Sequence, residues 1–221
     1  MLVLGVDCSS KQGSVALTKD GRPLYQCVYD SNMTHSQNLL SLVDNAVSVC
    51  GIKKEDIDLF AVTLGPGSFT GLRIGIALIK GMAMALNKPC VGVSSLKAMT
   101  ASVDLDGVVI PCFDARRGQV YCNVTDCGTI IADDDCCMAA DLEKYITATE
   151  KDIYFVGDGK DVCYNKFENY DNVKKHSVLM PCIAYGACLL AEKMPVQTHF
   201  ELSPSYLRLS QAERELKEKN K

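Results

Sequence analysis

The chain has 221 residues, 48% of them hydrophobic, which is enough to bury the core of one large domain or two small ones. It carries 27 acidic and 23 basic side chains, so its net charge is −4 at pH 7 and its isoelectric point is near 5.4. This acidic balance argues against autonomous nucleic-acid binding, which depends on many basic contacts to phosphates, and indicates that any nucleic-acid role needs a partner's basic surface.

The N-terminal run MLVLGVDCSS predicts a buried strand followed by a polar turn. It lacks a basic start, and Asp7 interrupts its apolar residues too early for a secretory signal, so we expect a cytoplasmic protein. Residues 13–30 predict two further strands, joined at the hairpin signal Asp20-Gly21. Three strands that can pair in antiparallel fashion therefore open the chain.

Residues 34–51 predict the first helix. Thr34 and Gln37 have the spacing of a capping box, and Gly51 is placed to end the helix. The apolar side chains between them recur at helical spacing, at Leu39, Leu42, Val43, Ala46, Val47 and Cys50. One face of this helix should therefore be apolar.

Residues 57–65 predict a buried strand, residues 71–87 a second helix rich in small residues, and residues 89–95 another strand. The second helix contains Arg73 and Lys80, and its apolar stretch falls short of the ~20 residues that span a bilayer. We therefore expect no membrane anchor.

The second half repeats the order of the first. Residues 107–126 again form an apolar strand that ends in Asp, a short turn with Gly, and a strand that resumes with Val. The corresponding residues are Asp7, Gly13 and Val15 in the first half and Asp114, Gly118 and Val120 in the second. Helical residues 139–146, a strand at 152–159, a helix at 182–194 and a charged tail at 211–221 follow.

Two halves on one plan predict a duplicated α/β architecture with two lobes, residues 1–103 and residues 104–221. This is the plan of the actin-like and sugar-kinase-like ATPases, which have a ribonuclease H-like fold and bind nucleotide between the lobes. Fold analogy alone does not supply the function.

The candidate nucleotide cleft comprises Asp7, Ser9, Asp114, Gly157 and Gly159. The two aspartates, at strand ends, could coordinate a Mg-nucleotide, or they and Ser9 could cap their own turns. The two glycines could approach an adenine closely, or could form a tight turn after a strand.

The stretch GPGSFTGLRIG, residues 65–75, is the most glycine-rich in the chain. It matches neither a P-loop, because no lysine follows Gly71, nor a dinucleotide fingerprint, because its third glycine is one residue late. Two interpretations stay open. The turn could hold an anion near Arg73. Alternatively, Gly65 and Gly67 turn the chain while Gly71, Gly75 and Gly81 thin the helix so that another helix approaches, and we favour this second interpretation.

Neither a serine nor a histidine has a catalytic setting in the sequence. The serines lack a G-x-S-x-G elbow, and His35 has no carboxylate that can be read nearby. The twelve cysteines show no C-x-x-C spacing and mostly sit singly in apolar runs, which indicates buried, reduced thiols. The pairs Cys136-Cys137 and Cys122/Cys127 leave a metal site as the less favoured alternative.

Six segments in order resemble the bacterial TsaB family, also called YeaZ, of the tRNA threonylcarbamoyladenosine pathway. They are LGVDCSS, HSQNLL, GPGSFTGLRIG, GVSSL, DARRGQVY and SPSYLR, and GPGSFTGLRIG is the most specific. The resemblance implies an actin-like fold and a non-catalytic subunit that pairs with the paralogue TsaD, with the ATPase TsaE completing the assembly. It implies tRNA contact through TsaD, no membrane, no cofactor bound catalytically, and ATP or ADP at most at the complex.

The resemblance also implies that the first two helices bind TsaD, or a second copy of the chain when TsaD is absent. The interface residues so predicted are Leu39, Val43, Leu72, Arg73, Ile76 and Ile79. TsaD holds its metal with an H-x-x-x-H motif, where this chain has Ser95 and Met99, so we expect neither a catalytic metal nor catalytic residues. The alternatives are an ATP-dependent phosphotransferase or ATPase of the same fold and, with less support, a peptidase.

Overall fold

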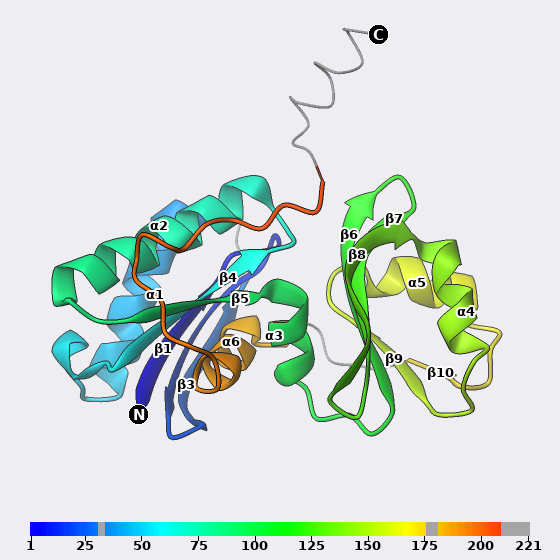
Figure 1. Cartoon of the computed structure of the whole chain (residues 1–221), viewed down its shortest axis with the longest axis horizontal. Coiled ribbons are helices and arrows are strands. Elements are labelled where there is room, and N and C mark those ends of the chain that lie inside the picture. The colour runs from blue at the N-terminus through cyan, green and yellow to red at the C-terminus, as the bar shows by residue number, and fades with distance from the viewer. Residues whose placement is uncertain (31–33, 176–180, 209–221) are drawn as a thin grey trace, which may run out of the picture.

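The computed structural model describes residues 1–30, 34–175 and 181–208, and the predicted charged tail at 211–221 lies outside these residues. The chain forms two lobes, each built around a five-stranded sheet (Figure 1).

The first sheet has the strand order β3-β2-β1-β4-β5. Its strands are β1 (Leu2–Asp7), β2 (Gly13–Lys19), β3 (Arg22–Tyr29), β4 (Leu59–Gly65) and β5 (Cys90–Ser94). The first three strands are antiparallel, whereas β4 and β5 continue the sheet in parallel with β1. Side chains of β1 and β4 are buried on both faces of the sheet, as their continuous apolar sequences predict.

The second sheet repeats this plan, with the order β8-β7-β6-β9-β10. Its strands are β6 (Val108–Arg116), β7 (Gln119–Asp126), β8 (Thr129–Met138), β9 (Ile153–Val156) and β10 (Val173–Lys174). Strand β6 pairs antiparallel with β7 and parallel with β9, as β1 does with β2 and β4. The prediction of a duplicated two-lobed α/β architecture is therefore confirmed.

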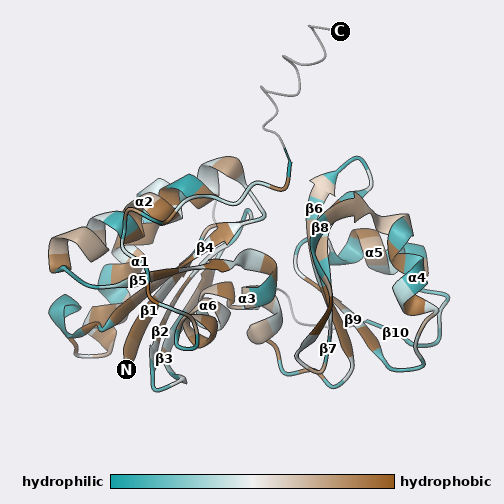
Figure 2. Ribbon diagram, viewed as in Figure 1, coloured by the Kyte–Doolittle hydropathy of each residue, from teal (hydrophilic) through white to brown (hydrophobic). Residues whose placement is uncertain are grey.

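Five layers stack across the molecule. Helices α1 (His35–Val49) and α2 (Phe69–Leu86) cover the outer face of the first sheet. Helices α3 (Ser95–Ala101) and α6 (Ile183–Ala191) lie between the two sheets, in a core shared by both lobes. Helices α4 (Glu143–Ile146) and α5 (Lys160–Phe167) cover the second sheet on its far side. Figure 2 shows that the apolar residues follow the strands and the helix faces turned towards them.

The two long helices begin and end close to their predicted limits. The Gln37 side chain accepts from the Thr34 backbone N–H at 3.0 Å, which confirms the capping box, and Gly51 follows α1 with a φ of +64°. Helix α2 begins two residues before the predicted Gly71, because Ser68 serves as its N-cap. By length and composition α2 could cross a membrane, but one of its faces lies in the core of the first lobe.

The C-terminal part of the chain returns to the first lobe. Helix α6 packs on β1, β2 and β4, and Cys90 of β5 forms a β-bridge with Gln197. The division between residues 103 and 104 therefore separates the two sheets, but α6 and the segment after it pack with the first sheet. Two short 3₁₀ turns, Lys54–Asp56 and Ala139–Leu142, complete the described elements.

Candidate functional site

The five apolar residues predicted to contact a partner are instead inside the first lobe. The exposed fraction of each side chain is 4% or less within the single chain, for Leu39, Val43, Leu72, Ile76 and Ile79. All five belong to the core cluster between the first sheet and helices α1 and α2. Their prediction as interface contacts is wrong, because a side chain that the sheet already covers has no surface left to bury.

The outward side of α2 carries a different set of residues, which we call the α2 outer face. It comprises Arg73, Ile74, Ala77, Leu78, Gly81 and Met84. Ile74 and Leu78 are half-buried, the other four are exposed, and Met84 is 63% exposed. These positions recur at three- and four-residue intervals and so share one side of the helix. A Cβ added at Gly81 would meet no atom within 4 Å, so this face is open as well as mostly apolar.

Sequence reasoning missed this face because α2 is apolar on nearly all sides. Residues 72, 76, 79 and 83 form one stripe and residues 74, 78 and 82 form another, and the sequence does not tell which stripe the sheet covers. The exposed small residues at 77, 81 and 85 were the available signal, since a helix side lined with alanine and glycine contributes little to its own core.

The glycine stretch at 65–75 is packed against the turn between β1 and β2. A Cβ on Gly67 would lie 2.2 Å from the Ser9 carbonyl oxygen, and one on Gly71 would lie 2.0 Å from the Cys8 carbonyl oxygen. The Ser68 N–H donates to the Ser9 carbonyl at 2.7 Å. The expectation that Gly71 admits another helix is therefore corrected: Gly67 and Gly71 admit the backbone of the β1–β2 turn. At Gly81, which has open space around it, the expectation stays a prediction.

Two of the free backbone N–H groups at the start of α2 are engaged within the chain. The Gly71 N–H donates to the Ser68 hydroxyl at 3.2 Å, and the Leu72 N–H donates to the Ser68 carbonyl at 2.9 Å. Because the Ser68 N–H is also taken, two of the four amides that precede the first intrahelical bond, those of Ser68 and Gly71, have partners inside the protein. The packing interpretation of the glycine stretch accounts for the geometry.

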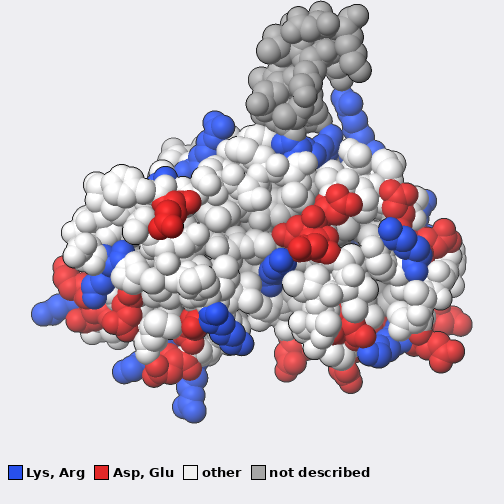
Figure 3. All heavy atoms as spheres, in the orientation of Figure 1, with Lys and Arg blue, Asp and Glu red and all other residues white. Residues whose placement is uncertain are grey.

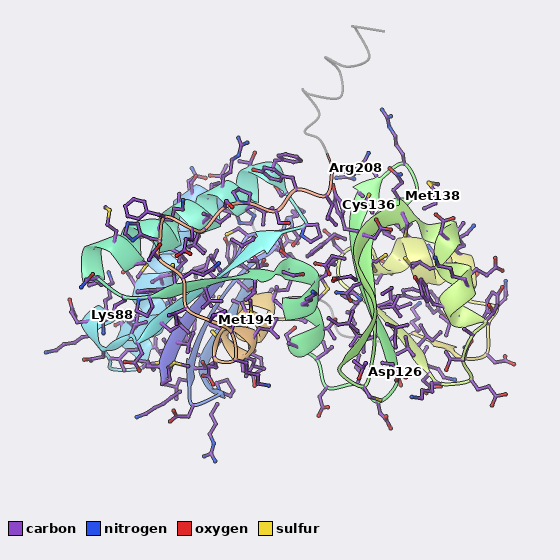
Figure 4. The ribbon with its side chains drawn as sticks, viewed as in Figure 1. Lys88, Asp126, Cys136, Met138, Met194 and Arg208 are labelled. Atoms are coloured by element: carbon purple, nitrogen blue, oxygen red, sulfur yellow. The ribbon has the colours of Figure 1, made fainter. Side chains whose placement is uncertain are left out.

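A C-terminal strap, residues 203–208, runs over the glycine stretch and reaches the second lobe. The Ser205 N–H donates to the Leu64 carbonyl at 2.7 Å, and a Cβ on Gly65 would lie 2.3 Å from the Ser205 carbonyl oxygen. The strap ends at Arg208, whose Nη1 donates to the Ala115 carbonyl of β6 at 2.8 Å. Figure 4 shows Arg208 beside Cys136, at the end of β8.

The same strap holds Arg73, the one charged residue predicted for the interface. The Tyr206 ring stacks on Phe69 with 4.2 Å between the ring centroids, and Arg73 Nε donates to the Tyr206 hydroxyl at 2.9 Å. Arg73 is therefore exposed but fixed in orientation. It lies at one end of the α2 outer face, where it can add charge to an apolar contact surface.

Asp7 lies at the end of β1 and is fully buried. Its Oδ1 accepts from the Ser9 N–H at 3.1 Å and from the Thr63 hydroxyl at 2.7 Å. Burial raises the pKa of Asp7 above its ordinary value, and these hydrogen bonds offset only part of the shift. The buried Ser9 hydroxyl oxygen has no partner in the described structure. The arrangement fits a turn-capping role for Asp7.

Asp114, the corresponding residue of the second lobe, binds its own turn. Its Oδ1 accepts from the Arg116 N–H at 2.7 Å, and the Arg116 guanidinium lies 3.5 Å from its Oδ2. The Asp114 N–H donates to Asp158 at 3.0 Å. Burial raises the pKa of Asp158, and the negative charges of Asp114 and Asp7 add to the shift. Sequence reasoning passed over Asp158, although it stands between the two glycines that were selected.

Gly157 and Gly159 admit the chain's own atoms. A Cβ on Gly157 would lie 2.3 Å from the Cys112 carbonyl oxygen and 2.8 Å from the Met99 sulfur, and one on Gly159 would lie 2.9 Å from the Phe113 carbonyl carbon. Close packing against β6 and α3 therefore explains both glycines. The adenine contact considered for them stays a prediction.

Ser95 and Met99 occupy the positions of the H-x-x-x-H motif and are fully buried. Met99 belongs to the core shared by the two lobes. Across residues 1–30, 34–175 and 181–208, no three histidine, cysteine or acidic side chains are grouped so that they could hold a metal ion.

His35 was considered as a base, but both of its ring nitrogens have partners. Nδ1 lies 2.7 Å from the Tyr29 hydroxyl and Nε2 lies 2.9 Å from the Ser10 carbonyl oxygen. These contacts tie the start of α1 to the β1–β2 turn, so His35 has a positioning role in the first lobe.

A groove of about 690 Å³ lies between the lobes. It is at the opposite end of the junction between the lobes from Asp7 and Asp114. It is lined by α3, the connection at 103–106 and the β7–β8 turn, and Val109 near the start of β6 contributes to it. Asp114 lies five residues further along that strand, which is roughly 16 Å at ordinary strand rise. The groove is therefore distinct from the predicted nucleotide cleft.

Strand β8 holds the second lobe against α3. Lys97 forms an ion pair with Asp133 at 2.9 Å, and the Ser94 hydroxyl donates to Asp134. Figure 3 shows acidic side chains gathered on this face over the junction between the lobes. Together with Arg208 of the strap, these contacts connect the lobes on the face in view.

The chain is similar to proteins of one tRNA-modification pathway. The family model described as "TsaD: tRNA N6-adenosine threonylcarbamoyltransferase" matches residues 30–215. The tRNA threonylcarbamoyladenosine biosynthesis protein TsaB of Bacillus subtilis (strain 168) is 30% identical over 225 residues, which cover 96% of each chain. The TsaB protein of Escherichia coli (strain K12) is 35% identical over 127 residues, which cover 55% of this chain and 53% of that one.

Solved structures show the same fold. The structure titled "YeaZ from Pseudomonas aeruginosa" has a TM-score of 0.74 at 23% identity and covers 93% of this chain and 99% of its own. A ROK hexokinase from Thermus thermophilus has a TM-score of 0.51 at 10% identity and covers 87% and 99%. The predicted sugar-kinase-like plan is thereby confirmed as a fold.

Proposed function

Because the chain belongs to the TsaB (YeaZ) family, we propose that it is a non-catalytic scaffold subunit for threonylcarbamoylation of the tRNA adenosine 3′ of the anticodon. In this proposal it works in the cytoplasm with TsaD and TsaE and contacts tRNA through TsaD. A second copy takes the place of TsaD when TsaD is absent.

The α2 outer face is the observation that carries this proposal. Apart from Arg73 it is apolar or small along its length, and its exposed members Ala77, Gly81 and Met84 lie outside the core cluster of the lobe. Ile74 and Leu78 are half-buried at the edge of that cluster. Small residues at 77 and 81 let a second helix approach closely, which is how helices pack at 8–10 Å between axes. A partner helix laid on this face would cover Met84 and the half-buried Ile74 and Leu78.

The inter-lobe residues support a non-catalytic role over the alternative of an ATP-dependent phosphotransferase. Asp7 is buried and bonded to its own turn, and Asp114 is bonded to Arg116. The negative charges of Asp7 and Asp114 act on Asp158, so this end of the cleft gathers carboxylates that would repel phosphates unless a cation intervened. We propose that ATP or ADP belongs to the assembly and is not turned over by this chain.

The substitution Gly81→Glu tests the scaffold proposal directly. It places a charge on the α2 outer face at a position with open space, and glutamate forms helix better than glycine, so the fold should be retained. The matched control is Asn165→Glu, an exposed position on α5 in the second lobe. We expect Gly81→Glu to abolish co-elution with TsaD and transfer to tRNA in a reconstituted TsaD and TsaE reaction, and Asn165→Glu to retain both.

Two results would contradict this proposal. If Gly81→Glu binds TsaD and supports transfer as well as the wild type does, the partner does not lie on this face. If the isolated chain hydrolyses ATP, and Asp7→Asn or Asp114→Asn removes that hydrolysis, the phosphotransferase alternative takes the place of the scaffold proposal.

A further inference from the structure

Two cysteine side chains of the second lobe contact each other. Cys122 on β7 and Cys137 on β8 have 3.6 Å between their sulfur atoms. Cys122 pairs with Asp135 across the two antiparallel strands, so Cys137, two residues further along, projects on the same side of the sheet as a diagonal neighbour. The contact therefore follows from the strand register.

The pair is open to small molecules from one side. Cys122 is only 3% exposed, whereas Cys137 is half-buried, and both line a small cavity of about 40 Å³ together with Lys144 and Tyr145. A water molecule needs about 10–15 Å³ of such volume, so a molecule of the size of hydrogen peroxide fits. Cys137 is the thiol that an incoming molecule meets first.

The surroundings make the two thiols unequal. The two thiols share a hydrogen bond in which either sulfur can be the donor. This bond lowers the pKa of Cys137 below its ordinary value, and the positive charge of Lys144 acts in the same direction. Burial and the carboxylates of Asp135 and Asp141 oppose these effects. The same hydrogen bond, with burial, raises the pKa of Cys122. Cys137 is also the more exposed of the two thiols, and we therefore assign it as the nucleophile and Cys122 as its partner.

We propose that Cys122 and Cys137 form an oxidisable dithiol that a hydroperoxide converts to a reversible disulfide. The Cys137 thiolate attacks one peroxide oxygen, the O–O bond breaks, and Cys137 becomes a sulfenic acid while hydroxide leaves. The Cys122 sulfur then attacks the Cys137 sulfur, an S–S bond forms, and the sulfenic oxygen leaves as water with the Cys122 proton. In total, two thiols and one hydrogen peroxide give one disulfide and two waters.

Diagonal neighbours on antiparallel strands are ordinarily about 7–8 Å apart and a disulfide bridges Cα atoms up to about 6.8 Å apart, so β7 and β8 must shift slightly towards each other. The sulfur atoms must approach by about 1.5 Å to reach the length of a disulfide bond. A dithiol reductant reverses the reaction by thiol-disulfide exchange, which leaves the two thiols and oxidises the reductant. The bond would tie β8 to β7 beside Asp133 and Asp134, the residues that hold the first lobe through Lys97 and Ser94.

Other cysteines of the chain provide internal controls. Cys112 and Cys163 interact with each other, but both are fully buried, so a peroxide has no direct access to them. Cys127 is exposed and is the thiol that nonspecific oxidation should reach first. Selective loss of Cys122 and Cys137 would therefore separate a built dithiol from general thiol damage.

The test uses the full chain, reduced and then treated with increasing hydrogen peroxide under native conditions. After denaturation and alkylation with N-ethylmaleimide, we expect reactive thiols to fall from twelve to ten, with a peptide linking Cys122 to Cys137 that disappears after dithiothreitol. The exposed-thiol control, Cys127→Ser, should form the same link. The inference is overturned if Cys127 oxidises while both pair members stay fully alkylated, or if Cys122 links to another cysteine.

The variant Cys122→Ser tests the order of the two steps. Without its partner, Cys137 should accumulate as a sulfenic acid that dimedone traps, whereas Cys137→Ser should leave Cys122 reduced. A dimedone adduct on Cys122 in the Cys137→Ser variant would overturn the assignment of the nucleophile. Should either variant fail to fold, the peptide map of the wild-type chain still decides whether the disulfide forms.

Discussion

Replacing glycine with alanine should have opposite effects on stability at two positions of α2, because Gly71 contacts the β1–β2 turn and Gly81 does not. A Cβ on Gly71 would lie 2.0 Å from the Cys8 carbonyl oxygen, so Gly71→Ala forces backbone to move by more than 1 Å to reach ordinary contact. Overpacking of this kind costs about 1–3 kcal/mol, and the helix propensity of alanine returns up to about 1 kcal/mol. We expect Gly71→Ala to lower the free energy of unfolding by about 1–2 kcal/mol.

Gly81→Ala should do the reverse. No atom lies within 4 Å of its added Cβ, so only the propensity gain of about 1 kcal/mol applies. The chain has no tryptophan, so urea unfolding is best followed by far-UV circular dichroism. At roughly 2–4 °C per kcal/mol, the two variants should differ by several degrees in Tm, on either side of the wild type. If Gly71→Ala is as stable as Gly81→Ala, the glycine stretch is not a packing element and the reasoning fails.

Burial raises the pKa of Asp7 in the folded state, so at a pH above that value the ionised carboxylate destabilises the fold. The substitution Asp7→Asn removes the cost of burying this charge and keeps an oxygen that accepts from the Thr63 hydroxyl. We expect the variant to be more stable than the wild type at pH 7, with a gain in stability that shrinks as the pH falls and vanishes below the unfolded carboxyl pKa of about 3.9. Unfolding curves between roughly pH 3.5 and 8 measure this gain. A loss of stability at pH 7 would contradict the prediction. Tyr206→Ala removes an aromatic stack on Phe69 worth about 0.5–1.5 kcal/mol. The backbone amides of the strap should therefore exchange hydrogen faster, while those of β1 stay protected. Unchanged exchange in the strap would mean that other contacts hold it. Arg208→Ala should speed exchange near Ala115 without changing exchange in α1, and equal protection in both forms would show that the strap does not hold the second lobe.

The order of elements and the duplication could be predicted because they depend on local signals. The Thr34 and Gln37 capping box, the Asp20-Gly21 hairpin and the repeated Asp-turn-Gly-Val pattern each act over a few residues, and the structure confirms them. The return of α6 to the first lobe has no such signal. It depends on packing between residues about 170 positions apart, such as the Ala184 N–H that donates to Ser14 at 3.0 Å.

The site was predicted less well than the fold for a physical reason. Leu72 and Ile74 are both large aliphatic residues on α2, and only the position of the sheet decides that one is fully buried and the other half-buried. Glycines have a similar ambiguity, because the sequence shows that a close approach exists and not which atoms approach. At Gly67 and Gly157 the approaching atoms are the chain's own carbonyl oxygens.

These observations connect the inner packing of α2 to its outer face. The β1–β2 turn uses its Cys8 and Ser9 carbonyls to seat the start of α2, and the position of α2 sets where its outer face lies. A backbone shift at Gly71 should therefore displace Arg73 and Ile74, although Gly71 itself is buried. We expect Gly71→Ala to weaken binding to TsaD under conditions in which the variant is still folded.

A titration of TsaD with the wild type and with Gly71→Ala, at a temperature well below both Tm values, measures this effect. A severalfold rise in Kd without loss of helical circular dichroism would show that the glycine stretch positions the contact surface. An unchanged Kd together with lowered stability would separate the two roles, because the turn would then stabilise the lobe without determining where the partner binds.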